Sequence, residues 1–188
     1  MSAPYPEPLR VAFVPGVTPG KWERIWRERR PRSRLDLIPM LQDAALAALT
    51  QGTAHMALLR DVAADDEWHA IPLYREAPVV VAPKGSLIAG LDSVNLAELA
   101  SLGDVVVLPV DLIGGNGSDA VELVAANVGV AVMPQSVARA TSRKDVVARP
   151  LTDGVETSIS LVWPTAGGHP LVDEFIGIVR GRTANSSR

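Results

Sequence analysis

The chain has 188 residues and a mass of 19.9 kDa, with 47% apolar and 21% charged residues. This composition supports a sizeable buried core and excludes global disorder. A formal charge of -3 argues against a dedicated nucleic-acid-binding domain, and the absence of cysteine excludes disulfides, a thiolate nucleophile and cysteine-containing zinc sites.

No apolar run reaches the roughly 18 residues that a membrane-spanning helix needs. The first eight residues carry three prolines and lack the cationic and apolar regions of a secretory signal. We therefore expect a cytoplasmic protein, with flexible termini at residues 1–8 and 183–188.

The first sixty residues predict two β-α-β steps. Three apolar segments are predicted as strands: Leu9–Val14, Leu35–Met40 and Ala54–Leu59. The helices between them are expected after Thr18, which we expect to cap free amides, and over Gln42–Gln51, which Gly52 closes. Because parallel neighbours need a long crossover, these steps predict an α/β fold with a parallel sheet.

The middle of the chain predicts an exit from this sheet. An acidic loop, Asp61–His69, precedes a long apolar segment at Ile71–Pro83, which is predicted to be a strand leaving the first sheet. The next segment contains several glycine and serine residues and precedes a predicted short amphipathic helix at Asn95–Leu99. We place a lobe boundary near Lys84.

The second half predicts a buried strand at Asp104–Val110, a glycine-rich loop at Asp111–Ser118 and a helix at Val121–Ala126. Asp119 is a candidate cap for this helix, and Asn127 is suited to a left-handed exit from it. The remaining predicted elements are strands at Val128–Met133, Val146–Leu151 and Thr157–Trp163 and helices at Gln135–Ser142 and Leu171–Arg180.

Four segments resemble the effector-binding domain of LysR-type transcriptional regulators. They are LRVAF from Leu9, LAALTQGTAHMALLR from Leu46, YREAPVVVAPKG from Tyr74 and LVAANVGVAVMP from Leu123. The resemblance implies a type 2 periplasmic-binding-protein fold, in which two Rossmann-like α/β lobes are joined by hinge crossings. We expect residues 9–84 and 160–182 to form lobe I and residues 85–159 to form lobe II.

The sequence departs from the family pattern in three places. The winged helix-turn-helix and linker helix of the family are not in this sequence, so DNA contact is expected only through a separate domain. His55 stands where an acidic residue usually opens the third strand, and Asn127 replaces a usual glycine. Between Val110 and Ala120 the chain is shorter than the family by about one β-α unit, which predicts a reduced second lobe.

Ligands of doubly wound folds bind outside the carboxyl ends of the strands. In the first lobe this indicates the amide of Val17, the hydroxyl of Thr18, the side chain of Gln42 and the guanidinium of Arg60, which can grip a carboxylate with two donors. Simpler alternatives are capping for Thr18, an exposed first-turn position for Gln42, and for Arg60 a salt bridge with Asp61 or Glu76.

The second lobe offers Gly115 and Ser118 in its glycine-rich loop, and Gln135 and Ser136 where a helix follows a strand. Turn chemistry alone is the alternative for both pairs. The loop lacks the Lys-Ser/Thr pair of a phosphate-binding P-loop and the spacing of a dinucleotide site.

Two further signals favour structural roles. Acidic residues interrupt a cluster of seven basic residues, which favours a solvated helix face or a subunit contact. The basic residues are Lys21, Arg24, Arg27, Arg29, Arg30, Arg32 and Arg34. Trp22 and Trp26 are interpreted as core or dimer anchors. His55, His69 and His169 show no catalytic or metal-binding spacing, so we expect no catalytic residue, metal or cofactor.

The resemblance therefore implies a homodimeric, non-enzymatic sensor that binds a small anionic effector between its lobes and biases the arrangement of subunits. The alternative is a stand-alone protein-interaction module derived from such a domain, without a DNA-binding half and without a ligand. The two hypotheses differ in whether a metabolite binds.

Overall fold

The computed structural model describes residues 7–102 and 105–181, which form two compact units. Unit 1 contains the described residues up to Leu73 and from Ile159 onward, and unit 2 contains Tyr74–Ser158. The chain therefore passes between the units twice. The expected boundary near Lys84 is placed too late, because the strand at Pro78–Pro83 pairs with strands of unit 2.

Unit 1 is built on a five-stranded sheet with the order β2-β1-β3-β9-β4. Its strands are β1 (Leu9–Phe13), β2 (Leu35–Pro39), β3 (Met56–Arg60), β4 (Trp68–Glu76) and β9 (Thr157–Pro164). β1 runs parallel to β2 and to β3, which confirms the two predicted β-α-β steps, whereas β9 runs antiparallel to β3. The carboxyl ends of β1, β2 and β3 consequently meet at one edge.

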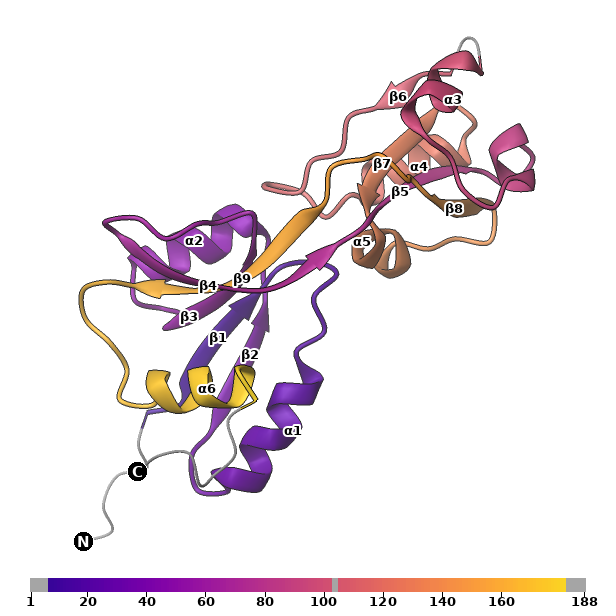
Figure 1. Cartoon of the computed structure of the whole chain (residues 1–188). Helices are drawn as coiled ribbons and strands as arrows, with labels where there is room; N and C mark the ends of the chain where they lie inside the picture. Colours follow the sequence, from indigo (N-terminus) through magenta and orange to yellow (C-terminus); the bar gives the residue numbers. More distant parts are fainter. Residues whose placement is uncertain (1–6, 103–104, 182–188) are drawn as a thin grey trace, which may run out of the picture. The chain divides into compact units, whose positions relative to one another are not determined.

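Three helices cover this sheet: α1 (Gly20–Arg29) and α6 (Val172–Val179) lie together on one face, and α2 (Gln42–Thr50) lies on the other (Figure 1). Trp26 of α1 is buried, and its ring lies 6.0 Å from that of Phe175 of α6. Its indole nitrogen donates to the Ser33 carbonyl at 2.7 Å. Trp26 is therefore a core residue of unit 1, and its polar edge is satisfied.

Helix α1 starts differently from the expectation. Pro19 occupies the N-cap position with no side-chain capping bond, and Thr18 is exposed. Capping is therefore the wrong role for Thr18. The predicted end of α2 is confirmed, since Gly52 follows it with φ of +69°, in the left-handed region that glycine enters at low cost.

Unit 2 contains a four-stranded sheet with the order β6-β7-β5-β8. Its strands are β5 (Pro78–Pro83), β6 (Val107–Leu108), β7 (Val130–Pro134) and β8 (Val146–Pro150). Alternate residues of β5 supply two cores: Val79 and Val81 pack on one face, and Val80 and Ala82 on the other. Four helices surround the sheet: the 3₁₀ helix η1 (Leu87–Gly90), α3 (Leu96–Ser101), α4 (Ser118–Ala125) and α5 (Gln135–Ala140).

Several expectations for this half need correction. The apolar segment at Ile71–Pro83 is two strands, β4 and β5, and not one. The predicted buried strand at 104–110 reduces to Val107–Leu108, with Val107 itself 52% exposed, and position 104 lies outside the described residues. Asp119 does not cap α4, since Gly117 precedes the helix and the Asn116 side chain accepts from the Ser118 amide.

The predicted left-handed exit from α4 is confirmed, because Asn127 adopts a φ of +62°. Within the described residues, none of the helices combines the length and apolar character needed to cross a bilayer.

Candidate functional site

The carboxyl edge of the unit 1 sheet brings Gln42 and Arg60 together. The Gln42 side-chain amide donates to the Arg60 carbonyl at 2.9 Å, and its oxygen accepts from the Arg60 backbone amide, also at 2.9 Å. Gln42 therefore hydrogen-bonds both backbone polar groups of the last residue of β3, as the backbone of a neighbouring strand would. Both polar ends of its side chain are used in this way, so the exposed first-turn alternative is wrong.

Arg60 is a nearly buried cation, with only 3% of its surface exposed. One terminal nitrogen, Nη2, donates to the Pro15 carbonyl at 3.2 Å, in the loop that follows β1. A guanidinium in such low-dielectric surroundings interacts more strongly with an anion than an exposed one does. The alternative of a salt bridge with Asp61 or Glu76 stays a prediction.

The same loop carries Val17 and Thr18. Val17 is 4% exposed, and its amide donates to the Val14 carbonyl at 3.2 Å, so this N–H is used within a turn. Val17 is thus not the amide donor that the sequence indicated. Thr18 is exposed and keeps its hydroxyl at the surface of the loop.

In unit 2, the glycine-rich loop and α5 lie against each other. A Cβ added at Gly117 would be 3.1 Å from Val137, which places the start of α4 beside the start of α5. Gly115 packs equally closely, because a Cβ there would be 3.0 Å from the Asp111 carbonyl. Asp111 also accepts from the amides of Ile113 and Gly114, so turn chemistry accounts for much of this loop.

Ser118, Gln135 and Ser136 lie where these two helices begin. The Ser118 hydroxyl donates to Asp119 at 3.4 Å, and the amide of the exposed Gln135 donates to the Ala77 carbonyl. The Ser136 hydroxyl oxygen is buried and has no hydrogen-bond partner among the described residues. Because a buried hydroxyl normally has a partner, Ser136 is the most distinctive polar group of the predicted unit 2 site.

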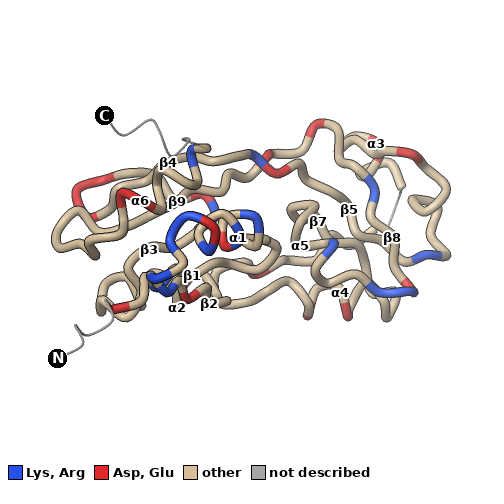
Figure 2. Tube along the Cα trace, turned by 90° about the horizontal axis from the view of Figure 1, so that it is seen from below, with Lys and Arg blue, Asp and Glu red and all other residues tan. Residues whose placement is uncertain are grey.

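The cationic region around α1 forms ion pairs with neighbouring acids. Arg27 pairs with Glu23 at 2.6 Å, and Arg24 pairs with Glu28 at 3.4 Å. Figure 2 shows the alternation of basic and acidic residues along this helix. A hydrogen bond from Arg30 also holds the pKa of Glu174 below its ordinary value. These pairs support the solvated-face interpretation.

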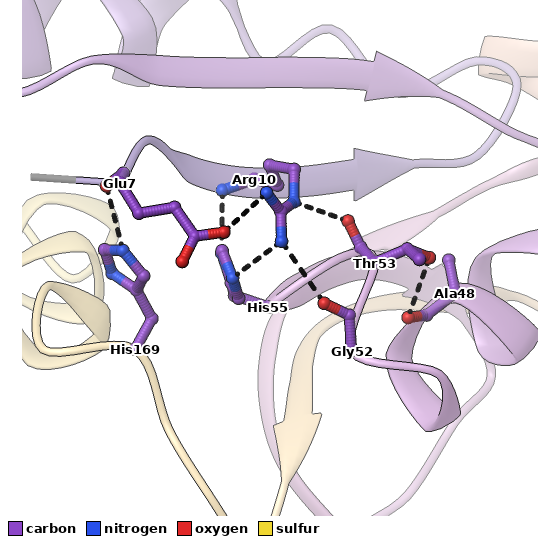
Figure 3. A network of polar contacts seen from close by, with 7 residues as sticks. All are labelled: Glu7, Arg10, Ala48, Gly52, Thr53, His55 and His169. Carbon is purple, nitrogen blue, oxygen red and sulfur yellow. Dashed lines mark hydrogen bonds and ion pairs between the residues drawn. The ribbon is translucent and has the colours of Figure 1, made fainter.

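The structure reveals a polar network that sequence reasoning missed, at the amino ends of β1 and β3 (Figure 3). The rings of His55 and His169, far apart in sequence, lie 4.5 Å apart. The Arg10 amide donates to His55 Nδ1 at 3.0 Å, and the Arg10 guanidinium pairs with Glu7 at 2.8 Å. Glu7 is thereby tied to β1, although residues 1–8 were expected to be flexible, and residues 1–6 and 182–188 lie outside the described part.

The surroundings of His55 in this network disfavour its protonation. Burial lowers the pKa of His55, and the nearby His169 and Arg10 lower it further, against a smaller opposing effect of Glu7. The ring also accepts the Arg10 amide hydrogen at Nδ1, which only an unprotonated nitrogen can do. No group of three or more His, Asp or Glu side chains with metal-binding geometry occurs in the described ranges.

Comparison with known proteins identifies one family. The family model described as LysR substrate binding domain matches residues 6–111 and 106–184. No curated protein matches the sequence significantly.

Similar solved structures confirm the fold, a mixed α/β architecture with two sheets of the type 2 periplasmic-binding kind. The effector-binding domain of a BenM variant has a TM-score of 0.73 and 17% identity, and the match covers 93% of each chain. A mutant OxyR regulatory domain from Pseudomonas aeruginosa has a TM-score of 0.70 and 16% identity, with 95% of this chain and 98% of that chain covered.

Longer chains are matched only in part. A Corynebacterium glutamicum OxyR mutant has a TM-score of 0.72 and 20% identity, and the match covers 96% of this chain but 65% of that chain. Full-length CbnR in complex with its target DNA has a TM-score of 0.70 and 18% identity, with 93% and 70% covered.

Proposed function

Because the chain belongs to the LysR substrate-binding domain family, a domain of transcriptional regulators, we propose that it senses a small anionic effector and performs no catalysis. The proposal includes a cytoplasmic location and DNA contact through a separate domain. CbnR, one of the similar proteins, has been solved as a full-length chain on its target DNA.

The observation that carries the proposal is the position of Arg60. Its guanidinium is almost buried at the carboxyl edge of three parallel strands, where ligands of such sheets bind. Gln42 holds its backbone through two hydrogen bonds, and Nη2 donates to the Pro15 carbonyl, so backbone and guanidinium are both held before any ligand arrives. A carboxylate or similar anion is the natural complement of a fixed guanidinium.

We assign a second set of ligand contacts to unit 2. Ser118 and the exposed Gln135 supply polar groups at the starts of α4 and α5, and the Ser136 hydroxyl has hydrogen-bonding capacity that no described residue uses. A bound effector alters the equilibrium between conformations only through its differential affinity for them.

Homodimerisation is the second part of the proposal. Val107 in the edge strand β6 is 52% exposed, and Val106 directly before the strand is 53% exposed. An exposed apolar edge of this kind favours pairing with another chain. A second copy of the chain is the occupant we propose for this edge. Trp26 is excluded as a dimer anchor because it is buried in unit 1.

A thermal-shift screen against carboxylates, amino acids and sugar phosphates tests the sensor proposal. A ligand at a hundredfold excess over its Kd should stabilise the native state by about 2.7 kcal/mol. Arg60→Met should abolish the shift while Arg24→Met, which removes an exposed guanidinium from α1, should preserve it.

Two results would count against the sensor. A shift that persists in Arg60→Met would place the ligand elsewhere. The absence of any shift over the whole panel, with the protein folded, would favour the protein-interaction module.

A further inference from the structure

Unit 1 contains a cavity of about 740 Å³ at the opposite end of β1 and β3 from Arg60. It is open to solvent between the loop that precedes β4 and the loop that follows β9, and its lining includes His55 and His169. The effector site proposed above uses none of its residues.

The two loops that form the cavity walls are held together by hydrogen bonds. The Asp65 carboxylate accepts from the amides of Glu67 and Trp68, both at 2.8 Å, which fixes the turn before β4. The Thr165 hydroxyl donates to the Asp66 carbonyl at 2.9 Å, and the Thr165 amide donates to the Glu67 carbonyl at 2.9 Å. The walls are thus positioned by the protein itself before any ligand binds.

The cavity is anionic. Glu7, Asp66 and Glu67 line it, and no lysine or arginine occurs among the described lining residues. Arg10 neutralises Glu7, whereas the Asp66 and Glu67 carboxylates make no ion pair or hydrogen bond with any described residue. Asp66 and Glu67 are exposed, so the lining presents two negative charges to solvent that no described residue neutralises.

Both histidine rings are also held by hydrogen bonds within the protein. His169 Nδ1 accepts from the Leu171 amide at 3.2 Å, and His55 Nδ1 accepts from the Arg10 amide at 3.0 Å.

Two indole rings complete the lining. Trp68 and Trp163 are half-buried there, and Trp163 lies against His69 with ring centroids 5.2 Å apart. Leu49, Ala54 and Val172 add apolar surface. Tryptophan faces attract cations more strongly than other side-chain rings do, and apolar walls favour a ligand with a hydrocarbon part.

We propose that this cavity binds a small organic cation, a primary amine or quaternary ammonium that carries an apolar group. The carboxylates of Asp66 and Glu67 complement its charge, and the indoles of Trp68 and Trp163 contact its body. Such a ligand differs in charge from the effector proposed for Arg60, and it occupies different residues. The two sites are therefore separable by experiment.

Calorimetric titration of the whole chain with benzyltrimethylammonium chloride tests the proposal. We expect saturable one-to-one binding that weakens about tenfold in the double variant Asp66→Asn/Glu67→Gln and about tenfold in Trp163→Leu. The double variant keeps the backbone carbonyls to which Thr165 donates, so the loops should retain their fold even if Trp163→Leu does not. Benzyl alcohol and phenylacetate, which lack the positive charge, should bind at least tenfold more weakly.

A control variant tests the location of the site. Glu23→Gln/Glu28→Gln removes two carboxylates from α1 and should leave binding unchanged. No saturable binding, unchanged affinity in Asp66→Asn/Glu67→Gln, or equal weakening in Glu23→Gln/Glu28→Gln would each overturn the proposal. Because the anion screen depends on Arg60 and this titration does not, failure of one leaves the other standing.

Discussion

Gln42 acts on Arg60 through the backbone, because its side-chain amide makes two hydrogen bonds to the last residue of β3. Replacing it by alanine removes both bonds and leaves a half-buried amide and carbonyl unsatisfied. Gln42→Ala should therefore lower the free energy of unfolding by about 1–3 kcal/mol in urea denaturation and weaken anion binding. Gln51→Ala, at the exposed end of α2, should change neither quantity, and equal effects of the two variants would contradict this role.

His55 should make stability depend on pH. Its pKa in the folded protein lies below the ordinary 6.5, so the unfolded chain binds its proton first on acidification. The contribution to stability is complete above this ordinary value and is lost as pH falls toward the folded pKa. We expect the melting temperature to fall between about pH 7.5 and about pH 5.5.

The variant His55→Asn tests the source of this dependence. Its side-chain oxygen can replace Nδ1 as acceptor of the Arg10 amide but does not titrate, so the pH dependence should flatten. His69→Asn removes an exposed histidine outside the network and should keep the slope of the original protein. A slope that is unchanged in His55→Asn would assign the dependence to other groups.

At the residue scale, the sequence predicted which residues lie at the candidate site better than it predicted the contacts those residues make. Arg60 and Gln42 were both selected because they follow strands, yet their mutual hydrogen bonds depend on the exact end of β3, one residue beyond the predicted Leu59. The meeting of His55 with His169 depends on the antiparallel pairing of β9 with β3, which no local pattern encodes.

At the scale of elements, the attachment of β6 to β7 depends on one glycine. A Cβ at Gly129 would lie 2.3 Å from the Val106 carbonyl oxygen, and the neighbouring Val130 amide donates to that same oxygen at 2.8 Å. Because the atom in the way is a backbone oxygen, which cannot rotate aside as a side chain can, Gly129→Ala must displace β6. We expect a loss of about 1–3 kcal/mol in the free energy of unfolding, measured by urea denaturation.

Gly90 supplies the matched comparison. An added Cβ there meets nothing within 4 Å, so Gly90→Ala should leave the unfolding midpoint close to that of the original protein. Comparable losses in the two alanine variants would mean that steric contact with Val106 does not explain the requirement at Gly129.

Most elements were predictable because their apolar period or their turn residues were clear. Asn127 is the best example, since its side chain is one of the few that tolerate a φ of +62°. The strand at 104–110 was overestimated because a run of valines satisfies strand propensity at an exposed edge as well as in a core. An edge strand and a core strand differ in the burial of their residues, and not in strand propensity.

At the scale of the whole molecule, the proposed dimer predicts a mass of twice 19.9 kDa in native mass spectrometry. Val107→Asp places a charge on the exposed edge of β6 and should shift the population toward monomer. Val155→Asp adds the same charge at an 87% exposed position of unit 2 and should leave the dimer intact. A monomer in the original protein, or equal dissociation in both variants, would contradict the dimer assignment.

The boundary near Lys84 was predicted from the glycine and serine residues that follow it, and the resemblance added the two-lobed fold. The position of the first crossing was missed by about ten residues. The apolar run at Ala77–Ala82 does not indicate which sheet it joins. A strand buried on both faces has the same continuous apolar pattern in either sheet. The expected shortening of lobe II between Val110 and Ala120 stays a prediction.

Calorimetric titration with the most stabilising anion from the screen tests whether Arg60 is the anion-binding group. We expect one binding site per chain, at least about tenfold weaker binding in Arg60→Met, and unchanged affinity in the exposed-arginine control Arg24→Met. Equal affinity in Arg60→Met and the original protein would contradict the assignment of Arg60 as the anion-binding group, and with it the proposed sensor site.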